Sequence, residues 1–147
     1  MVQPPDRLES FESLLEIVKA LRGEQGCPWD KEQTHRSLTP YAIEEAHELA
    51  EAIESGSQTE VVGELGDVLL QVVLHAEIAR QEKRFDITDV IRTLSEKMVR
   101  RHPHVFAHTQ VSGSGEVLKN WAEIKAEEKK LTKQSGVTPL ERFDVPL

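Results

Sequence analysis

The apolar residues of the chain recur mostly at intervals of three or four positions, which is the spacing of amphipathic helices. The first such segment spans residues 8–21, with apolar side chains at Leu8, Phe11, Leu14, Leu15, Val18 and Leu21. This pattern predicts a helix. The glycines at positions 23 and 26 should end it, because glycine readily adopts the left-handed conformation that follows a helix. A loop should then extend to about Pro40.

The same spacing predicts four further helices. Thr39 followed by Pro40 is typical of a helix start, with threonine as the N-cap and proline in the first turn. That helix should run to about Glu54, where Ser55-Gly56-Ser57 breaks the pattern. The others should cover residues 59–82, a segment from Asp86 or Thr88 to about Arg101, and residues 117–132. No segment alternates as a strand does, so we predict an all-α fold, a compact antiparallel helical bundle.

The length and composition are those of a single globular domain. The chain has 147 residues, of which 38% are hydrophobic and 30% charged, as is usual in soluble proteins. We expect residues 1–132 to form one helical domain with its own core. Residues 133–147 are polar and contain proline and glycine, so we expect them to form an arm or linker.

The predicted helix over residues 59–82 is apolar around nearly its whole circumference. A helix of this kind is normally buried on all sides. Five helices in so short a chain should not cover all of its faces, so we expect a homo-oligomer, at least a dimer, to complete the bundle.

The charge is concentrated in one segment. The chain carries 18 Lys and Arg against 26 Asp and Glu, a net charge of −8, and no Lys or Arg lies between Arg36 and Arg80. This acidic balance argues against a nucleic-acid polymer as partner. No apolar run approaches the roughly 20 residues of a membrane span, and the polar start lacks the core of a signal peptide. With one cysteine and no internal disulfide, we expect a cytoplasmic protein.

Four acids of this segment stand out by their position on the predicted helices. Glu45 falls inside the apolar arc of its helix, with Glu48 at the edge of that arc. Glu64 and Asp67 share one face of the apolar helix that follows. Two helices joined by a short turn are antiparallel neighbours, so the two pairs should face each other and repel unless a cation lies between them. We interpret Glu51, Glu54, Glu60 and Glu77 as ordinary solvent-facing residues.

The chemistry of such a site favours a hard divalent cation. Carboxylate oxygens without cysteine select Mg²⁺, Mn²⁺ or Ca²⁺. No segment matches the calcium loop of an EF-hand. We therefore expect Mg²⁺, with Mn²⁺ as a possible substitute, and Mg²⁺ is commonly shared with phosphate oxygens.

Four motifs resemble the MazG family of all-α nucleoside triphosphate pyrophosphohydrolases. The acid pattern is Glu44-Glu45-x-x-Glu48, followed after 15 residues by Glu64-x-x-Asp67. The other blocks are Gly26-Cys27-Pro28-Trp29-Asp30-Lys31-Glu32-Gln33-Thr34, Gly63-Glu64-Leu65-Gly66-Asp67-Val68-Leu69 and Arg100-Arg101-His102-Pro103-His104-Val105-Phe106. The resemblance covers about residues 8–130 and is to the N-terminal domain of two-domain bacterial members. It implies a MazG-like catalytic domain over residues 1–132.

The resemblance implies an activity and a metal site. Family members hydrolyse nucleoside triphosphates between the α and β phosphates, giving the monophosphate and pyrophosphate, and serve as housecleaning enzymes of the nucleotide pool. The metal ligands of the family correspond here to Glu45, Glu48, Glu64 and Asp67. Glu44 would lie outside the residues that contact the metal, or would orient the attacking water. The resemblance also implies an oligomer, in agreement with the expectation from the apolar helix.

The resemblance further implies residues that bind the substrate. Lys97 and Arg101, four residues apart on one helix, would hold phosphates, with Lys97 assisting catalysis by neutralising charge on the leaving group. Trp121 would stack on the base, and Lys125 would add a cation. Trp121 could instead be a core residue and Lys125 an ordinary surface lysine. Trp29 could be a second base contact, although a plug that fixes its loop is the favoured interpretation.

A second function is compatible with the same sequence. The chain could be a non-catalytic acidic helical interaction module that retains the MazG fold. That alternative predicts no stabilisation by metal. The presence of every matched ligand and cation favours the enzyme.

Overall fold

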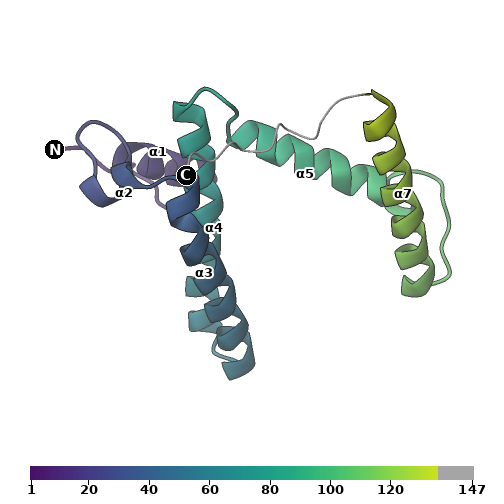
Figure 1. Cartoon of the computed structure of the whole chain (residues 1–147). Helices are drawn as coiled ribbons and strands as arrows, with labels where there is room; N and C mark the ends of the chain where they lie inside the picture. The colour runs from purple at the N-terminus through teal and green to yellow at the C-terminus, as the bar shows by residue number, and fades with distance from the viewer. Residues whose placement is uncertain (136–147) are drawn as a thin grey trace. The chain divides into compact units, whose positions relative to one another are not determined.

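The computed structural model describes residues 1–135, which form seven helices and no strand. The helices are α1 (Phe11–Leu21), α2 (Pro28–Glu32), α3 (His35–Ser55), α4 (Gln58–Gln81), α5 (Ile87–Arg101), α6 (Pro103–Phe106) and α7 (Ser114–Ser135) (Figure 1). The predicted all-α class is confirmed. The chain divides into two compact units, Met1–Ile87 with α1 to α4 and a second that begins at Thr88 with α5 to α7.

Helices α3 and α4 form a hairpin and lie side by side in the first unit (Figure 1). Gly56 closes α3 in the left-handed conformation, with φ of 75°, which is accessible to glycine without steric cost. Ser57 then caps α4 by accepting a hydrogen bond from the backbone N–H of Glu60 at 3.3 Å. This short turn makes α3 and α4 antiparallel, as predicted.

The predicted start of α3 at Thr39 and Pro40 is wrong, because the N-cap and the first helical residue each lie five residues earlier. Thr34 is the N-cap: its hydroxyl accepts from the N–H of Ser37 at 3.0 Å, and the Ser37 hydroxyl accepts from the N–H of Thr34 at 2.8 Å. This reciprocal box satisfies two N–H groups that a helix start leaves without partners. Pro40 therefore lies inside the helix, where it removes one backbone donor.

The core of the first unit lies where α1, the start of α3 and the C-terminal half of α4 meet. Its buried members are Val18, Leu38, Val73, Leu74 and Ile78, with Phe11, Leu14, Leu15 and Leu70 packed against them. Burying one side chain of this size contributes about 1.5–3 kcal/mol. This end of the hairpin therefore holds most of the apolar packing that stabilises the unit.

The N-terminal half of α4 is not buried within the described single chain. Val62 and Leu65 are 70% and 52% exposed, and Leu69 and Val72 are exposed as well. Only the stretch from Val73 to Ala79 is largely buried. Among residues 1–135, no atom lies within 4 Å of a Cβ added to Gly63 or Gly66, so no close contact in this part of the chain requires either glycine.

The solvent-facing interpretation of Glu77 is also wrong, whereas Glu51, Glu54 and Glu60 are exposed as predicted. Glu77 is 9% exposed. Its carboxylate accepts two hydrogen bonds from Arg80, from Nη2 at 2.6 Å and from Nε at 2.9 Å. The arginine one turn later thus compensates a charge that would otherwise be costly to bury.

Gly26 and Arg22 fix the segment between α1 and α3. A Cβ on Gly26 would lie 2.1 Å from the carbonyl oxygen of Leu21, so only glycine fits there. Arg22 donates from Nη1 to the carbonyl oxygens of Asp30 (2.5 Å) and Gln33 (3.0 Å), and from Nε to Oε1 of Gln81 (2.9 Å). Arg22 therefore fastens α2 to the C-terminal end of α4.

The second unit agrees with the predicted helices except at their ends. Helix α5 ends at Arg101 as predicted, and the short helix α6 follows. Helix α7 continues through residues 133–135, and the remainder of the predicted arm, 136–147, lies outside the described residues. None of the helices in residues 1–135 has the length and apolar character needed to span a membrane.

Candidate functional site

Three of the four predicted metal ligands lie together on the α3–α4 hairpin. Glu45 and Glu48, one turn apart on α3, and Glu64 on α4 each place one carboxylate oxygen within 4.8 Å of the other two. The antiparallel packing of the hairpin produces this grouping, since it sets one face of α3 against α4. Asp67, one turn after Glu64, is exposed and lies outside this group of three.

The electrostatics of this cluster are unfavourable in the absence of a cation. Burial, together with the negative charges of Asp67 and Glu48, raises the pKa of Glu45 to about 7. Burial likewise raises the pKa of Glu64, with Glu48 and Asp67 contributing. Although Asp67 lies outside the group, its charge therefore acts on both glutamates. One oxygen of Glu45 and one of Glu64 are buried without a hydrogen-bond partner in the described part of the chain.

The donor set fits a divalent cation. It consists of hard carboxylate oxygens from residues of neighbouring helices, and it includes buried oxygen atoms that accept no hydrogen bond from the described residues. Such unsatisfied groups carry a substantial desolvation cost. A hard cation bound by these oxygens would remove both that cost and the mutual repulsion. Glu44, by contrast, is exposed on α3 and does not belong to the group.

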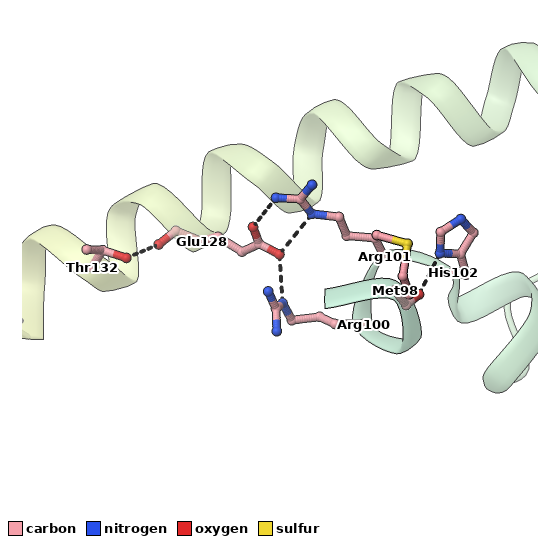
Figure 2. Close-up of polar contacts among 6 residues, drawn as sticks. All are labelled: Met98, Arg100, Arg101, His102, Glu128 and Thr132. Carbon is pink, nitrogen blue, oxygen red and sulfur yellow. Dashed lines mark hydrogen bonds and ion pairs between the residues drawn. The ribbon is translucent and has the colours of Figure 1, made fainter. Parts of the chain in front are cut away.

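The predicted phosphate-binding cations lie in the second unit. Lys97 is half-buried on α5, and Arg101 is the last residue of that helix. Figure 2 shows that Arg101 is held by Glu128 of α7, with Nη2 2.9 Å from Oε2. The Glu128 carboxylate also accepts a hydrogen bond from Nε of Arg100 at 2.7 Å. Hydrogen bonds from Arg101 and Arg100 lower the pKa of Glu128 to about 2.

The sequence interpretation missed Glu128. A signal existed, because Glu128 follows Lys125 by three residues and so lies on the same side of α7. An acid on a face proposed to bind a polyanion is unexpected unless it contacts a cation. Its partners, however, come from another helix, and helical spacing within α7 does not identify them.

Trp121 occupies an aromatic cluster near the end of α5. Its ring meets that of His102 edge to face, with centroids 5.1 Å apart and planes at 74°. The indole Nε1 is buried and has no hydrogen-bond partner among residues 1–135. Trp121 is therefore half-buried rather than a full core residue, and Lys125, one turn further along α7, is exposed.

Trp29 is exposed rather than enclosed. It lies on α2 and is 46% exposed. Its ring contacts that of Tyr41 edge to face at 5.6 Å between centroids, and Tyr41 lies on α3 one turn before Glu45. Trp29 thus packs against α3 on one side and faces solvent on the other. It is less buried than expected for a side chain that plugs and fixes its loop.

The carboxylates belong to the first unit, whereas Lys97, Arg101, Trp121 and Lys125 belong to the second. The structure thus groups the acidic half of the predicted site within one hairpin. It groups the cations and the tryptophan on α5 and α7.

Comparison with known proteins assigns the same chemistry to relatives of this chain. The sequence model of the MazG nucleotide pyrophosphohydrolase domain matches residues 33–106. The chain is 53% identical over 127 residues to "Nucleoside triphosphate pyrophosphohydrolase/pyrophosphatase MazG" of Thermotoga maritima, covering 86% of this chain and 48% of that protein. It is 46% identical over 123 residues to "Nucleoside triphosphate pyrophosphohydrolase" of Escherichia coli, covering 83% and 47%.

Two further similarities extend this picture. "Uncharacterized protein YabN" of Bacillus subtilis is 53% identical over 125 residues, which cover 85% of this chain and 26% of that protein. The crystal structure of a MazG-related protein from Thermotoga maritima superposes with a TM-score of 0.65 at 30% identity, covering 78% of this chain and 98% of that one. The chain spans between a quarter and a half of the length of these three curated relatives.

Proposed function

The chain belongs to the MazG nucleotide pyrophosphohydrolase family, and on that premise we propose that it hydrolyses nucleoside triphosphates between the α and β phosphates. Water bonds to the α-phosphorus, and the bond from that phosphorus to the oxygen leading to the β-phosphate breaks. The products are a nucleoside monophosphate and pyrophosphate, and the role is housecleaning of the nucleotide pool. The observation that carries this proposal is the group of unsatisfied carboxylates on α3 and α4.

Glu45, Glu48, Glu64 and Asp67 hold Mg²⁺ in this proposal, and Mn²⁺ can take its place. A bound divalent cation would neutralise phosphate oxygens and favour the ionisation of water. Glu44, exposed beside Glu45, orients the attacking water. Because the pKa of Glu45 is raised to about 7, part of the molecules must lose a proton from this carboxyl when a cation binds near neutral pH.

The second unit supplies the contacts to the substrate. Lys97, Arg101 and Lys125 bind phosphate oxygens, and Lys97 offsets the charge that develops on the leaving pyrophosphate. Trp121 provides a flat face for the base. Stacking against an indole does not distinguish one base from another, so we expect a permissive enzyme.

The exposed apolar half of α4 supports a homodimer or larger oligomer of this chain. Val62, Leu65, Leu69 and Val72 together expose apolar surface on consecutive turns. Large contiguous apolar patches are uncommon on monomers. A second copy would remove this surface from water and complete the bundle.

The experiment that tests the activity is a panel of NTPs and dNTPs incubated with Mg²⁺, with the products separated by anion exchange. We expect monophosphate and pyrophosphate in equal amounts. Diphosphate and inorganic phosphate would contradict cleavage between the α and β positions. If no nucleotide is cleaved and Mg²⁺ with a non-hydrolysable triphosphate fails to raise the melting temperature, the non-catalytic interaction module is the better description.

A further inference from the structure

Glu128 makes a contact to which no part of the proposed reaction assigns a role. Its carboxylate, from the middle of α7, lies against the last two residues of α5, Arg100 and Arg101 (Figure 2). Of these two residues, Arg101 is the one that binds a phosphate group of the substrate in the proposed function. We propose that Glu128 is a positioning residue that holds the Arg101 guanidinium by one edge and thereby presents its other edge to a phosphate group. This inference rests on the proposed function.

The geometry of the contact is edge-on. Nη2 of Arg101 lies 2.9 Å from Oε2 of Glu128, and Nε lies 3.4 Å from Oε1. The two residues are both mostly buried at this contact, with side chains 21% and 22% exposed. A guanidinium is planar and carries five N–H donors in a rigid fork, so fixing one edge fixes the direction of all the others.

The opposite edge of the guanidinium keeps its donors. Among residues 1–135, no oxygen accepts a hydrogen bond from Nη1 of Arg101. Nη1 and the second hydrogen of Nη2 form the pair of parallel donors that binds two oxygens of one phosphate. Glu128 therefore leaves free the edge that a phosphate needs.

The charges leave the group attractive to an anion. Arg100 donates to the same carboxylate from Nε at 2.7 Å, so two guanidinium groups share one carboxylate and the triad keeps a net positive charge. The pKa of Glu128 is lowered to about 2, so the contact persists at every pH at which the enzyme would be assayed. Glu128 thus orients Arg101 without neutralising it fully.

The backbone around the triad is also fixed. Nδ1 of His102 donates to the carbonyl oxygen of Met98 at 2.5 Å, which closes the last turn of α5, the turn that carries the two arginines (Figure 2). On α7, the Thr132 hydroxyl donates to the carbonyl oxygen of Glu128 at 2.9 Å. A side chain held between two ordered helix segments loses less conformational entropy when a ligand binds.

The test measures anion binding, which needs no turnover. Titration calorimetry with pyrophosphate and Mg²⁺ gives Kd for the wild type, Glu128→Ala, Glu128→Gln, Arg101→Ala and the double variant Arg101→Ala/Glu128→Ala. We expect Glu128→Ala to weaken Kd about tenfold, the loss of roughly one charge-assisted hydrogen bond. The double variant should bind no more weakly than Arg101→Ala alone, because Glu128 acts only through Arg101. Glu127→Ala is the matched control, because Glu127 is exposed at the preceding position of α7 and its replacement should leave Kd unchanged.

Three results would overturn the inference. The first two are an unchanged Kd for Glu128→Ala, or a lower Kd, which is expected if Glu128 competes with phosphate for Arg101. The third is that the losses of binding free energy in the two single variants add fully in the double variant. Glu128→Gln keeps the size of the side chain, so a correctly folded variant is available if the alanine variant does not fold. With active enzyme, KM should rise for Glu128→Gln while kcat changes little, which a merely structural role would not produce. A wild type that binds pyrophosphate in this pattern but cleaves no nucleotide would refute the proposed function and leave the role of Glu128 intact.

Discussion

His35 and His75 face each other across α3 and α4 as a stacked pair, with ring planes 3° from parallel and centroids 5.0 Å apart. Their Nδ1 atoms are 2.7 Å apart, so one nitrogen must donate and the other accept, and the accepting ring must be neutral. Burial lowers the pKa of both histidines. Glu82 raises the pKa of His35 in part, whereas Arg84 and Arg22 lower it.

This pair contributes stability that is lost in mild acid. The unfolded chain binds protons near pH 6.5, whereas the folded chain resists them. The stability that the neutral pair contributes is therefore fully present above about pH 6.5 and declines as the pH falls below it. When the pH is lowered from 7.5 to 5.5, the change in unfolding free energy measured with urea should be less favourable for the wild type than for His75→Phe. His108→Gln, at an exposed position, is the control and should change as the wild type does.

Replacing Glu45 by glutamine should stabilise the metal-free protein while abolishing turnover. The pKa of Glu45 is raised to about 7, so keeping its charge costs folding free energy that grows from about pH 4.5 and is complete above pH 7. Without metal at pH 8, Glu45→Gln should melt a few degrees higher than the wild type, and at pH 4 the two should melt together. A lower melting temperature at pH 8 would show that the carboxylate is already satisfied. Glu54→Gln, exposed on the same helix, should change neither property.

Metal binding should be linked to proton release. Because Glu45 titrates near pH 7, a cation bound by its carboxylate must displace a proton from part of the molecules at that pH. We expect the apparent affinity for Mg²⁺ to fall as the pH is lowered from 8 to 6. Calorimetry in two buffers of different ionisation enthalpy measures the protons released, and a proton count of zero at pH 6.5 would exclude Glu45 as a ligand.

Substitution of two leucines of α4 should affect different properties, the stability of the fold for Leu74 and the association of copies for Leu65. Leu74 is 2% exposed in the core, and Leu74→Ala should cost about 2–5 kcal/mol of unfolding free energy. Leu65 is 52% exposed, and Leu65→Asp should leave the fold of the single chain intact but reduce the molar mass measured by light scattering. An unchanged mass would place the interface between copies away from this half of α4.

Helical periodicity predicted α1, α5 and α7 closely because each carries its own apolar stripe, and the long apolar run between two serine or acidic breaks predicted α4. It failed at Pro40 because the capping box of Thr34 and Ser37 depends on side-chain hydrogen bonds rather than on apolar spacing. The sequence singled out Glu45 by its position in the apolar arc of its helix, and in the structure burial raises the pKa of this carboxyl. The burial of Glu77 and the contact of Glu128 with Arg101 could not be predicted, because both depend on how helices pack rather than on positions within one helix.

The α3–α4 hairpin has its packing at one end and its acids at the other. The buried residues of α4 all lie between Val73 and Ala79, whereas Glu64 and Asp67 lie on its earlier turns, where the neighbouring side chains are largely exposed. Backbone amides of residues 58–68 should therefore exchange with deuterium faster than those of residues 73–79 in the metal-free protein. A cation bound between α3 and α4 would stabilise this end of the hairpin, where apolar packing is absent. The site would then become rigid only when the cation is bound.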